Sequence, residues 1–235
     1  MTAAEVMAEL EAKGTAQTKK TYLRHGAREP VFGVKVADLK VLQKRIKVDH
    51  RLALELYATG NSDAMYLAAL VADPPAATKA ELNRWVKAAY WSYLSEYAVP
   101  WVASESRFAV ELATAWMAAE PPTTRAAGWS TYASYTSITP DAALDLAAIA
   151  GLLDRVRRDI GGAPNRVKYV MNGFVIAVGG YVTPLHAAAT ATATAISPVA
   201  VDMGDTACTV PDALGHIAAM AARGTLGRKR KSARC

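Results

Sequence analysis

The stretch from Pro74 to Tyr93, PPAATKAELNRWVKAAYWSY, contains the pattern that decides the fold. Two adjacent prolines interrupt the chain, and Thr78 follows as a residue whose hydroxyl can cap a helix. Glu81 stands three residues later and can complete a capping box, so a helix is predicted over residues 79–90. This pattern, a break followed by a helix with a defined start, is used below to predict the helices in the rest of the chain.

The same alternation of break and helix extends outward in both directions. Pairs of helix-breaking residues recur at Pro121-Pro122 and Gly161-Gly162, and Thr139-Pro140 is typical of an N-cap followed by a proline in the first helical position. No segment shows a confident strand pattern, and only residues 199–203 are expected to be extended. The segment 91–103 contains Pro100, and further helices are predicted over residues 3–12, 15–24, 36–48, 50–58, 62–72, 104–118, 123–135, 140–153, 165–181, 183–196 and 211–222.

Comparable helix positions recur at a ragged interval along the chain. The segments at residues 63–65, 91–93, 125–127 and 166–168 are separated by 28, 34 and 41 residues. This spacing is the size of HEAT-like repeats, which consist of two helices each. Stacked repeats form a curved α-solenoid with a concave face. The sequence therefore predicts an all-α solenoid of HEAT-like repeats, with a globular helical bundle as the alternative.

The composition is that of a folded helical chain. Of 235 residues, 52% are hydrophobic and 20% are charged, which supplies a core and excludes a disordered chain. An all-β sandwich would need more β-branched and aromatic residues at a regular turn spacing. We expect a single domain over residues 1–222, followed by a basic, disordered tail over residues 223–235.

The positive charge is concentrated at the two ends of the chain. Residues 1–51 carry 11 basic and 6 acidic side chains, residues 52–222 carry 10 and 15, and residues 223–235 carry 6 and none. This asymmetry favours an anionic partner such as nucleic acid, although a basic tail can also serve solubility alone. The tail can be interpreted as a non-specific DNA clamp, whose removal would flatten the salt dependence of binding.

Several classes of protein are excluded by simple patterns. Cys208 and Cys235 are too few for a disulfide framework or a four-thiolate zinc site, which is consistent with a reducing cytoplasm. Residues 1–10 have neither the basic nor the apolar region of a signal peptide. Residues 169–201 lack charge, but glycines and a proline interrupt them, so we expect two buried helices and no contact with a membrane.

Motifs for phosphate loops, dinucleotide sites and nucleophile elbows do not occur, and the four histidines are scattered. No metal or cofactor is expected. The notable feature is a crowd of aromatic residues that suits base stacking and equally suits packing between repeats. These residues are Trp85, Tyr90, Trp91, Tyr93, Tyr97 and Trp101, followed by Trp116, Trp129, Tyr132 and Tyr135.

Short helical signatures in the chain resemble the DNA alkylation repair family, which includes the AlkD-type DNA glycosylases. The opening of that family is similar to YLR at 22–24, FGVK at 32–35 and ADLK at 37–40. Its catalytic segment is similar to YWSYLS at 90–95, and two later motifs resemble RAA at 125–127 and NGF at 172–174. The resemblance covers about residues 15–190, and the closing stretch resembles a divergent branch of the family.

The resemblance implies a C-shaped solenoid whose cationic concave groove holds duplex DNA. Active members of the family excise N3-alkyladenine and N7-alkylguanine without a metal and without flipping the base into a pocket. Two tryptophans and an aspartate contact the deoxyribose of the damaged nucleotide. Because the leaving base is already cationic, a carboxylate and aromatic faces suffice to stabilise an oxocarbenium-like sugar.

The match at single positions is mixed. Trp91 corresponds to the first tryptophan, but Phe174 replaces the second, and Ser95 stands where the aspartate belongs. Serine cannot supply the negative charge that an oxocarbenium ion needs. Glu96 is adjacent, but one residue turns it by about 100° around an α-helix. An irregular turn would be required to aim this carboxylate at the sugar.

Three functions are consistent with these residues. The favoured one is a monomeric protein that binds double-stranded DNA, including alkylated or otherwise non-canonical DNA, through backbone phosphates. The second is an alkylpurine glycosylase that uses Glu96 beside Trp91 and Phe174. The third is a scaffold that binds protein and has no nucleic-acid role. The candidate DNA contacts are Lys19, Lys20, Tyr22, Arg24, Lys35, Lys40, Lys44, Lys47, Arg125, Arg166 and Lys168.

Overall fold

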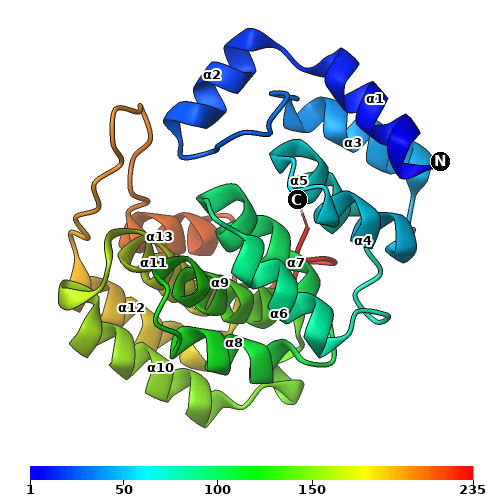
Figure 1. Ribbon diagram of the computed structural model, residues 1–235. Coiled ribbons are helices and arrows are strands. Elements are labelled where there is room, and N and C mark those ends of the chain that lie inside the picture. The colour runs from blue at the N-terminus through cyan, green and yellow to red at the C-terminus, as the bar shows by residue number, and fades with distance from the viewer. Residues whose placement is uncertain (235) are drawn as a thin grey trace.

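The computed structural model describes residues 1–234, and within this range all regular structure is helical, as predicted. Figure 1 shows the helices stacked layer on layer, with α1–α3 at one end and α10–α13 at the other. The α-helices are α1 (Ala3–Lys13), α2 (Ala16–Arg24), α3 (Val36–Ile46), α4 (His50–Ala58), α5 (Ser62–Val71), α6 (Lys79–Ala88), α7 (Val99–Ser104), α8 (Ala109–Met117), α9 (Pro122–Ile138), α10 (Leu146–Asp159), α11 (Asn165–Tyr181), α12 (His186–Ile196) and α13 (Ala213–Ala222). The shorter elements are a π-helix η1 (Tyr93–Ala98) and the 3-10 turns η2 (Asp141–Ala143), η3 (Ile160–Gly162) and η4 (Thr183–Leu185).

Side-chain caps start several of these helices where the sequence places them. The Thr78 hydroxyl accepts the Glu81 amide, and the Glu81 carboxylate accepts the Thr78 amide at 2.8 Å, so the predicted capping box is confirmed. Asn61 caps α5 through its side-chain oxygen. Each such cap satisfies amides that the first turn leaves without a helical partner.

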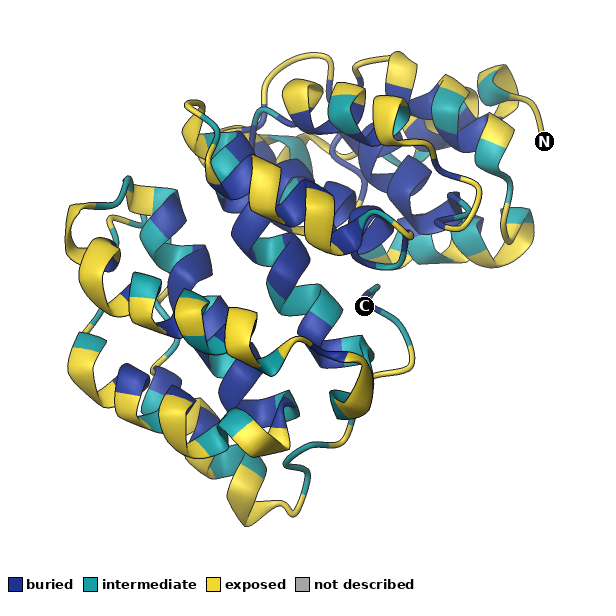
Figure 2. Cartoon of the chain, turned by 90° about the horizontal axis from the view of Figure 1, so that it is seen from below, coloured by how far each residue is buried: buried dark blue, intermediate teal, exposed yellow. Residues whose placement is uncertain are grey.

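The core lies between the helix layers and forms two clusters of buried apolar side chains. One cluster is built mainly by the helices from α1 to α7, and the other by α8 to α13. Figure 2 shows the result: most helices bury one side and expose the other. Helix α8 packs closely on α9. A Cβ atom added to Gly128 of α9 would lie 2.5 Å from the Met117 amide nitrogen of α8. Glycine therefore permits the close approach of these two helices.

The loop between α2 and α3 is held by one buried carboxylate. Asp63, at the start of α5, accepts the amides of Phe32 and Gly33 on one oxygen, at 2.7 and 3.0 Å. Its other oxygen accepts the Val34 amide at 2.9 Å. Burial raises the pKa of Asp63, and these three donors oppose the rise. The contact fixes the N-terminal repeat on the rest of the solenoid.

Several predicted helix boundaries are wrong, including the end of α10, which lies at Asp159 and not at residue 153. The helix expected from residue 104 begins only at Ala109, after a turn. The helix expected to reach residue 48 ends at Ile46, and Lys47 has a left-handed backbone with φ 65°, so Lys47 lies outside the helix that carries Lys40 and Lys44.

Pro140 does not open a helix either. Its backbone is extended and leads into the turn η2, and α10 begins after Asp145 because the Asp145 carboxylate caps the Ala148 amide at 2.9 Å. The segment expected to be extended, residues 199–203, forms no strand.

No single helix within residues 1–234 has both the length and the apolar composition to cross a membrane. The pair formed by α11 and the following segment Thr183–Ile196 meets both criteria only together, and it is bent by 114°.

The basic tail differs from the disordered segment expected from the sequence, since residues 223–234 pack against the solenoid. The Lys229 ammonium contacts Asp141 at 2.8 Å and the Thr136 carbonyl at 2.9 Å, both near the C-terminal end of α9. Glu105, after α7, accepts the Ser232 hydroxyl and the Ala233 amide at 2.6 and 2.7 Å. Cys235 lies outside the described residues. Figure 1 shows this end of the chain returning to α5 and α7.

We predict that Asp63→Ala lowers the free energy of unfolding by about 3 kcal/mol, because it leaves three backbone donors without an acceptor. The comparable loss of an exposed carboxylate, in Glu11→Ala, should change it by less than about 0.5 kcal/mol. Urea denaturation measures both values. Equal effects of the two substitutions would contradict the role of Asp63.

Deletion of residues 229–235 is expected to lower the free energy of unfolding by about 2 kcal/mol, because it removes the contacts to Glu105 and Asp141. For a chain of this size the melting temperature should fall by about 5 °C. The control is Lys231→Gln, which changes an exposed tail cation. A truncated chain that melts with the full-length protein would show that the tail contributes no stability.

Candidate nucleic-acid interface

A cleft of about 390 Å³ lies where four helices and one loop of the solenoid meet. It is bounded by the end of α2, the start of η1, the N-termini of α9 and α11, and the loop between α12 and α13. The residues that line it are Arg24, His25, Gly26, Tyr90, Trp91, Ser92, Ser95, Glu96, Pro122, Thr123, Ala126, Pro164, Asn165, Arg166, Asp202, Met203 and Thr206.

Two helices point their positive ends at this cleft. Pro121 precedes α9 and Pro164 precedes α11, and neither N-cap residue makes a side-chain hydrogen bond to its helix. Proline suits the start of a helix because the first amides have no helical acceptor. Helix N-termini favour anions through their amides and the helix dipole. The two helix ends thus favour an anion in the cleft, whose lining also includes the exposed Asp202.

Trp91 forms one wall of the cleft. Its side chain is 5% exposed and stacks on Tyr93, with 4.6 Å between ring centroids and 15° between the planes. Tyr22 packs on both rings at 5.6 Å, and its hydroxyl donates to the Val34 carbonyl. The indole nitrogen of Trp91 is buried and has no hydrogen-bond partner within residues 1–234. A buried donor without an acceptor is costly, so a ligand oxygen in the cleft would be favoured there.

The π-helix η1 brings two adjacent side chains to the cleft. Pro100 has no amide to donate to the Glu96 carbonyl, and the wider turn before it ends with a hydrogen bond from the Val99 amide to the Leu94 carbonyl. As a result, Ser95 and Glu96 both line the cleft, although they are consecutive residues. The irregular turn that would aim Glu96 into the site is therefore present.

Neither of these side chains is a free catalytic group. The Ser95 hydroxyl donates to the Trp91 carbonyl of its own helix at 3.1 Å. The Glu96 carboxylate binds the Arg166 guanidinium in a two-point ion pair, with 2.7 Å between Arg166 Nε and Glu96 Oε1 and a second contact from Nη2 to Oε2. The Glu96 side chain is 2% exposed and the Arg166 side chain is 34% exposed. The fork of the guanidinium thus occupies both oxygens.

Burial and pairing act in opposite directions on this carboxylate. Burial raises the pKa of Glu96, and the hydrogen bonds and charge of Arg166 oppose that rise. Burial lowers the pKa of Arg166, but the bonds to Glu96 outweigh this and raise it. The guanidinium also lies 4.2 Å above the Tyr169 ring. Arg166 is therefore held on the carboxylate from two sides.

The loop between α12 and α13 covers part of the cleft. The Asp202 amide donates to the Asn165 side-chain oxygen at 2.8 Å, and the Asn165 amide group donates back to the Asp202 carbonyl. The Met203 sulfur lies 3.8 Å from an Arg166 nitrogen. The segment around Asp202 is thus a turn tied to α11.

Comparison with known proteins identifies the relatives of this chain. The sequence profile of a family described as DNA alkylation repair enzyme matches residues 6–190. The chain belongs to this family. It is 33% identical to the uncharacterized protein Lin0241 of Listeria innocua and 32% identical to the uncharacterized protein Lmo0209 of Listeria monocytogenes. Each match covers 89% of this chain and 92% of the other protein.

A solved structure confirms the HEAT-like fold. It represents a new family of proteins related to the HEAT-like repeat DNA glycosylases, with affinity for branched DNA structures. It is 40% identical to this chain, with a TM-score of 0.91, and the match covers 100% of both chains. The alternative of a globular bundle unrelated to these repeats is therefore excluded.

The structure brings together only part of the residue set expected from the DNA alkylation repair family. Trp91, Glu96, Arg24 and Arg166 line the cleft. Phe174 does not, because it is 0% exposed and packs edge-on against core aromatic rings.

The other candidate DNA contacts lie outside the cleft lining. Arg125 donates to the carbonyls of Ala119 and Glu120 and lines a separate cavity beside Arg155 and Arg158. Lys19 pairs with Glu29 at 2.7 Å. The remaining cations on exposed or half-buried surface are Lys20, Lys35, Lys40, Lys44, Lys47 and Lys168.

Sequence reasoning missed the side chains that complete the cleft from other elements. These side chains are His25, Asn165 and Met203. The sequence predicts a helix from residue 165 and an extended segment over residues 199–203, and neither prediction indicates a site. One sequence signal could have indicated the cleft, because both helices that point at it begin beside a proline.

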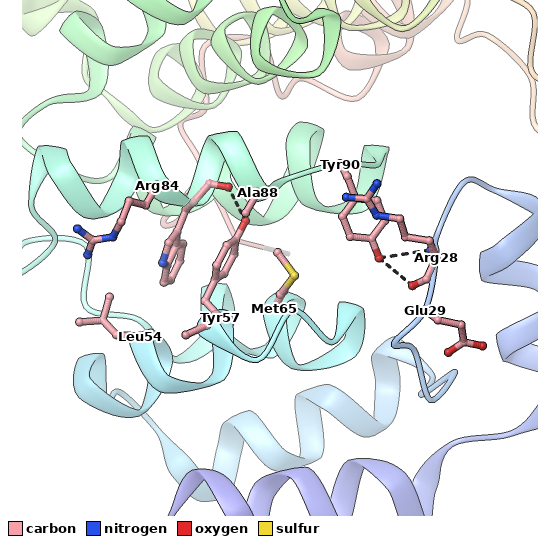
Figure 3. A pocket seen from close by; sticks show the side chains of 11 residues that line it. Arg28, Glu29, Leu54, Tyr57, Met65, Arg84, Ala88 and Tyr90 are labelled. Atoms are coloured by element: carbon pink, nitrogen blue, oxygen red, sulfur yellow. Dashed lines mark hydrogen bonds between the residues drawn. The ribbon is translucent and has the colours of Figure 1, made fainter.

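A larger cavity, of about 510 Å³, lies beyond Tyr90, between α4 and α6 (Figure 3). The aromatic rings that line this cavity already pack against other side chains. Tyr57 and Trp85 stack on each other at 4.1 Å and 4°, and the Arg28 guanidinium lies 4.1 Å above the Tyr90 ring. The cleft at Trp91, which offers an unpartnered donor and two helix N-termini, is therefore the better candidate for binding.

The ion pair at the cleft can be measured by a double-mutant cycle. Glu96→Gln and Arg166→Gln should each lower the free energy of unfolding by about 2 kcal/mol, less than the roughly 3–5 kcal/mol of a fully buried pair because Arg166 is a third exposed. The double variant should lose clearly less than the sum, since no unpaired charge remains. Additive losses in urea denaturation would show that the two residues are not coupled.

Proposed function

We propose that this chain binds branched DNA, with a backbone phosphate in the cleft at Trp91, and does not cleave glycosidic bonds. The absence of glycosidic cleavage is inferred from the charge and hydrogen bonding of the two polar side chains beside Trp91. The Ser95 hydroxyl is neutral and bonded to its own helix, and the Glu96 carboxylate is neutralised by Arg166. Neither of these two side chains then offers a free negative charge to a developing oxocarbenium ion.

Phosphate binding is supported by what the cleft offers. Two helix N-termini without side-chain caps, the indole N–H of Trp91 and the exposed Arg24 all favour an oxygen anion. Such contacts position a nucleic acid without reading its sequence. The affinity should therefore fall steeply with salt concentration and depend little on sequence.

The preference for branched DNA is supported by the structural relative. That protein family has affinity for branched DNA structures, and this chain matches it over its full length at 40% identity. The exposed cations at the two ends of the chain, on α2, α3 and the tail, supply further phosphate contacts.

One observation favours a second candidate, an alkylpurine glycosylase. Trp91 and Glu96 line the same cleft, and the π-turn aims the carboxylate into it. Catalysis would then require Arg166 to leave Glu96 when DNA binds.

The test compares the affinity of the full-length protein for a four-way junction and for a linear duplex of the same base composition. We expect tighter binding to the junction. Arg24→Gln should weaken junction binding about fivefold and reduce the slope of log K against log salt by about one, because one phosphate contact is lost. Arg51→Gln is the control, since Arg51 is exposed on α4 and does not line the cleft.

Fluorescence anisotropy at two salt concentrations gives all of these values. Equal effects of the two arginine substitutions would contradict a phosphate site in the cleft. Failure to bind any DNA at low salt would favour a protein-binding scaffold.

A further inference from the structure

Another cavity, of about 330 Å³, is lined mainly by aromatic rings that come from distant parts of the chain. Tyr66 comes from α5, Tyr93 and Tyr97 from η1, and Trp101 from α7. Val36, at the start of α3, and Arg230, from the C-terminal tail, complete the lining. Its volume is within the range that accommodates a small planar ligand.

The rings of this cavity meet at steep angles, and one of them is exposed. Tyr66 meets Trp101 at 80°, and Tyr97 meets Tyr93 at 78° and Trp101 at 61°, with centroids 5.4–6.2 Å apart. Tyr97 is 38% exposed, which is unusual among the aromatic side chains of this chain. The cavity therefore offers ring faces on which a further planar group can stack.

Arg230 places a positive charge at the same cavity. Its backbone amide is anchored to the Ser137 carbonyl at 2.9 Å, which fixes the tail at this point. The guanidinium donates to the carbonyls of Ala233 and Arg234 in the tail, and it has no ion pair with a carboxylate of residues 1–234. An uncompensated guanidinium repels a cationic ligand and favours an anionic one.

The cavity adjoins the cleft described above. Trp91 lines the cleft, Tyr93 lines the cavity, and the two rings stack on each other at 4.6 Å. A single pair of stacked rings thus lies between the cleft and the aromatic cavity. A group that is planar, aromatic and attached to an anion is a nucleotide.

We infer that the aromatic cavity binds an unpaired nucleobase of branched DNA, with Arg230 contacting the phosphate next to that base. This inference rests on the proposed binding of branched DNA and adds the element that distinguishes a branch from a duplex. A continuous duplex keeps its bases stacked on one another, while a junction offers bases that can leave the stack at low cost. Stacking on aromatic side chains is tolerant of base identity, so the site selects structure and not sequence.

The experiment uses a three-way junction with 2-aminopurine at the unpaired nucleotide of the branch point, and the same fluorophore paired inside a linear duplex. Addition of the full-length protein should quench the junction signal at least about twofold, because the base stacks on tyrosine and tryptophan. The duplex signal should stay unchanged.

Variants of the cavity separate stacking from general attraction. Tyr97→Leu should abolish the quenching and weaken junction binding about tenfold while leaving duplex affinity unchanged, and Tyr97→Phe, which keeps the ring, should retain both. Arg230→Gln should weaken junction binding more than duplex binding. Lys231→Gln, which changes the next cation of the tail, should weaken the two equally if at all.

Tight junction binding without quenching, or with quenching that Tyr97→Leu does not alter, would overturn the inference and leave the proposed function standing. Equal losses on junction and duplex for Tyr97→Leu would also overturn it. Absence of binding to either DNA would overturn the inference and the proposed function together. Circular dichroism of each variant confirms that the helical fold is kept.

Discussion

The ion pair between Glu96 and Arg166 is the contact on which the site depends. It joins η1 to the first turn of α11 across 70 residues of sequence, and it buries a carboxylate almost completely. Such a pair is retained only if its geometry satisfies both partners, because the desolvation of each charge is costly. Its position decides two properties at once. It holds the N-terminus of α11 against the cleft, and it neutralises the Glu96 carboxylate, which could otherwise assist sugar chemistry beside Trp91.

Local irregularities of the chain build the surroundings of this pair. Pro100 widens the helix before it into a π-turn, and that turn presents Ser95, Glu96 and the rings of Tyr93 and Tyr97 to two adjoining cavities. The C-terminal tail closes the second cavity because Glu105 and Asp141 anchor it. Binding in a HEAT-like solenoid thus arises here where regular helix packing is interrupted, and not on the regular helix faces.

Local sequence signals predicted most of the fold and less of the site. Capping residues and proline or glycine pairs marked the helices, and the capping box at Thr78 is an example that depends on four consecutive residues only. The early start assigned to α10 failed because Pro140 and Asp145 both resemble helix starts, and only tertiary packing decides between them. Trp91 and Glu96 were found from their motif. Arg166, the partner of Glu96, lies 70 residues away, and no local pattern pairs the two.

The central claim is that this relative of the DNA glycosylases binds DNA without cutting the glycosidic bond. The most direct measurement is single-turnover release of 7-methylguanine from a duplex that carries this lesion, with excess wild-type protein under conditions in which binding is complete. The account predicts no release above the spontaneous rate, because Arg166 neutralises Glu96 and Ser95 has no charge. Release that is lost in Glu96→Gln would contradict it, since the carboxylate would then be catalytic.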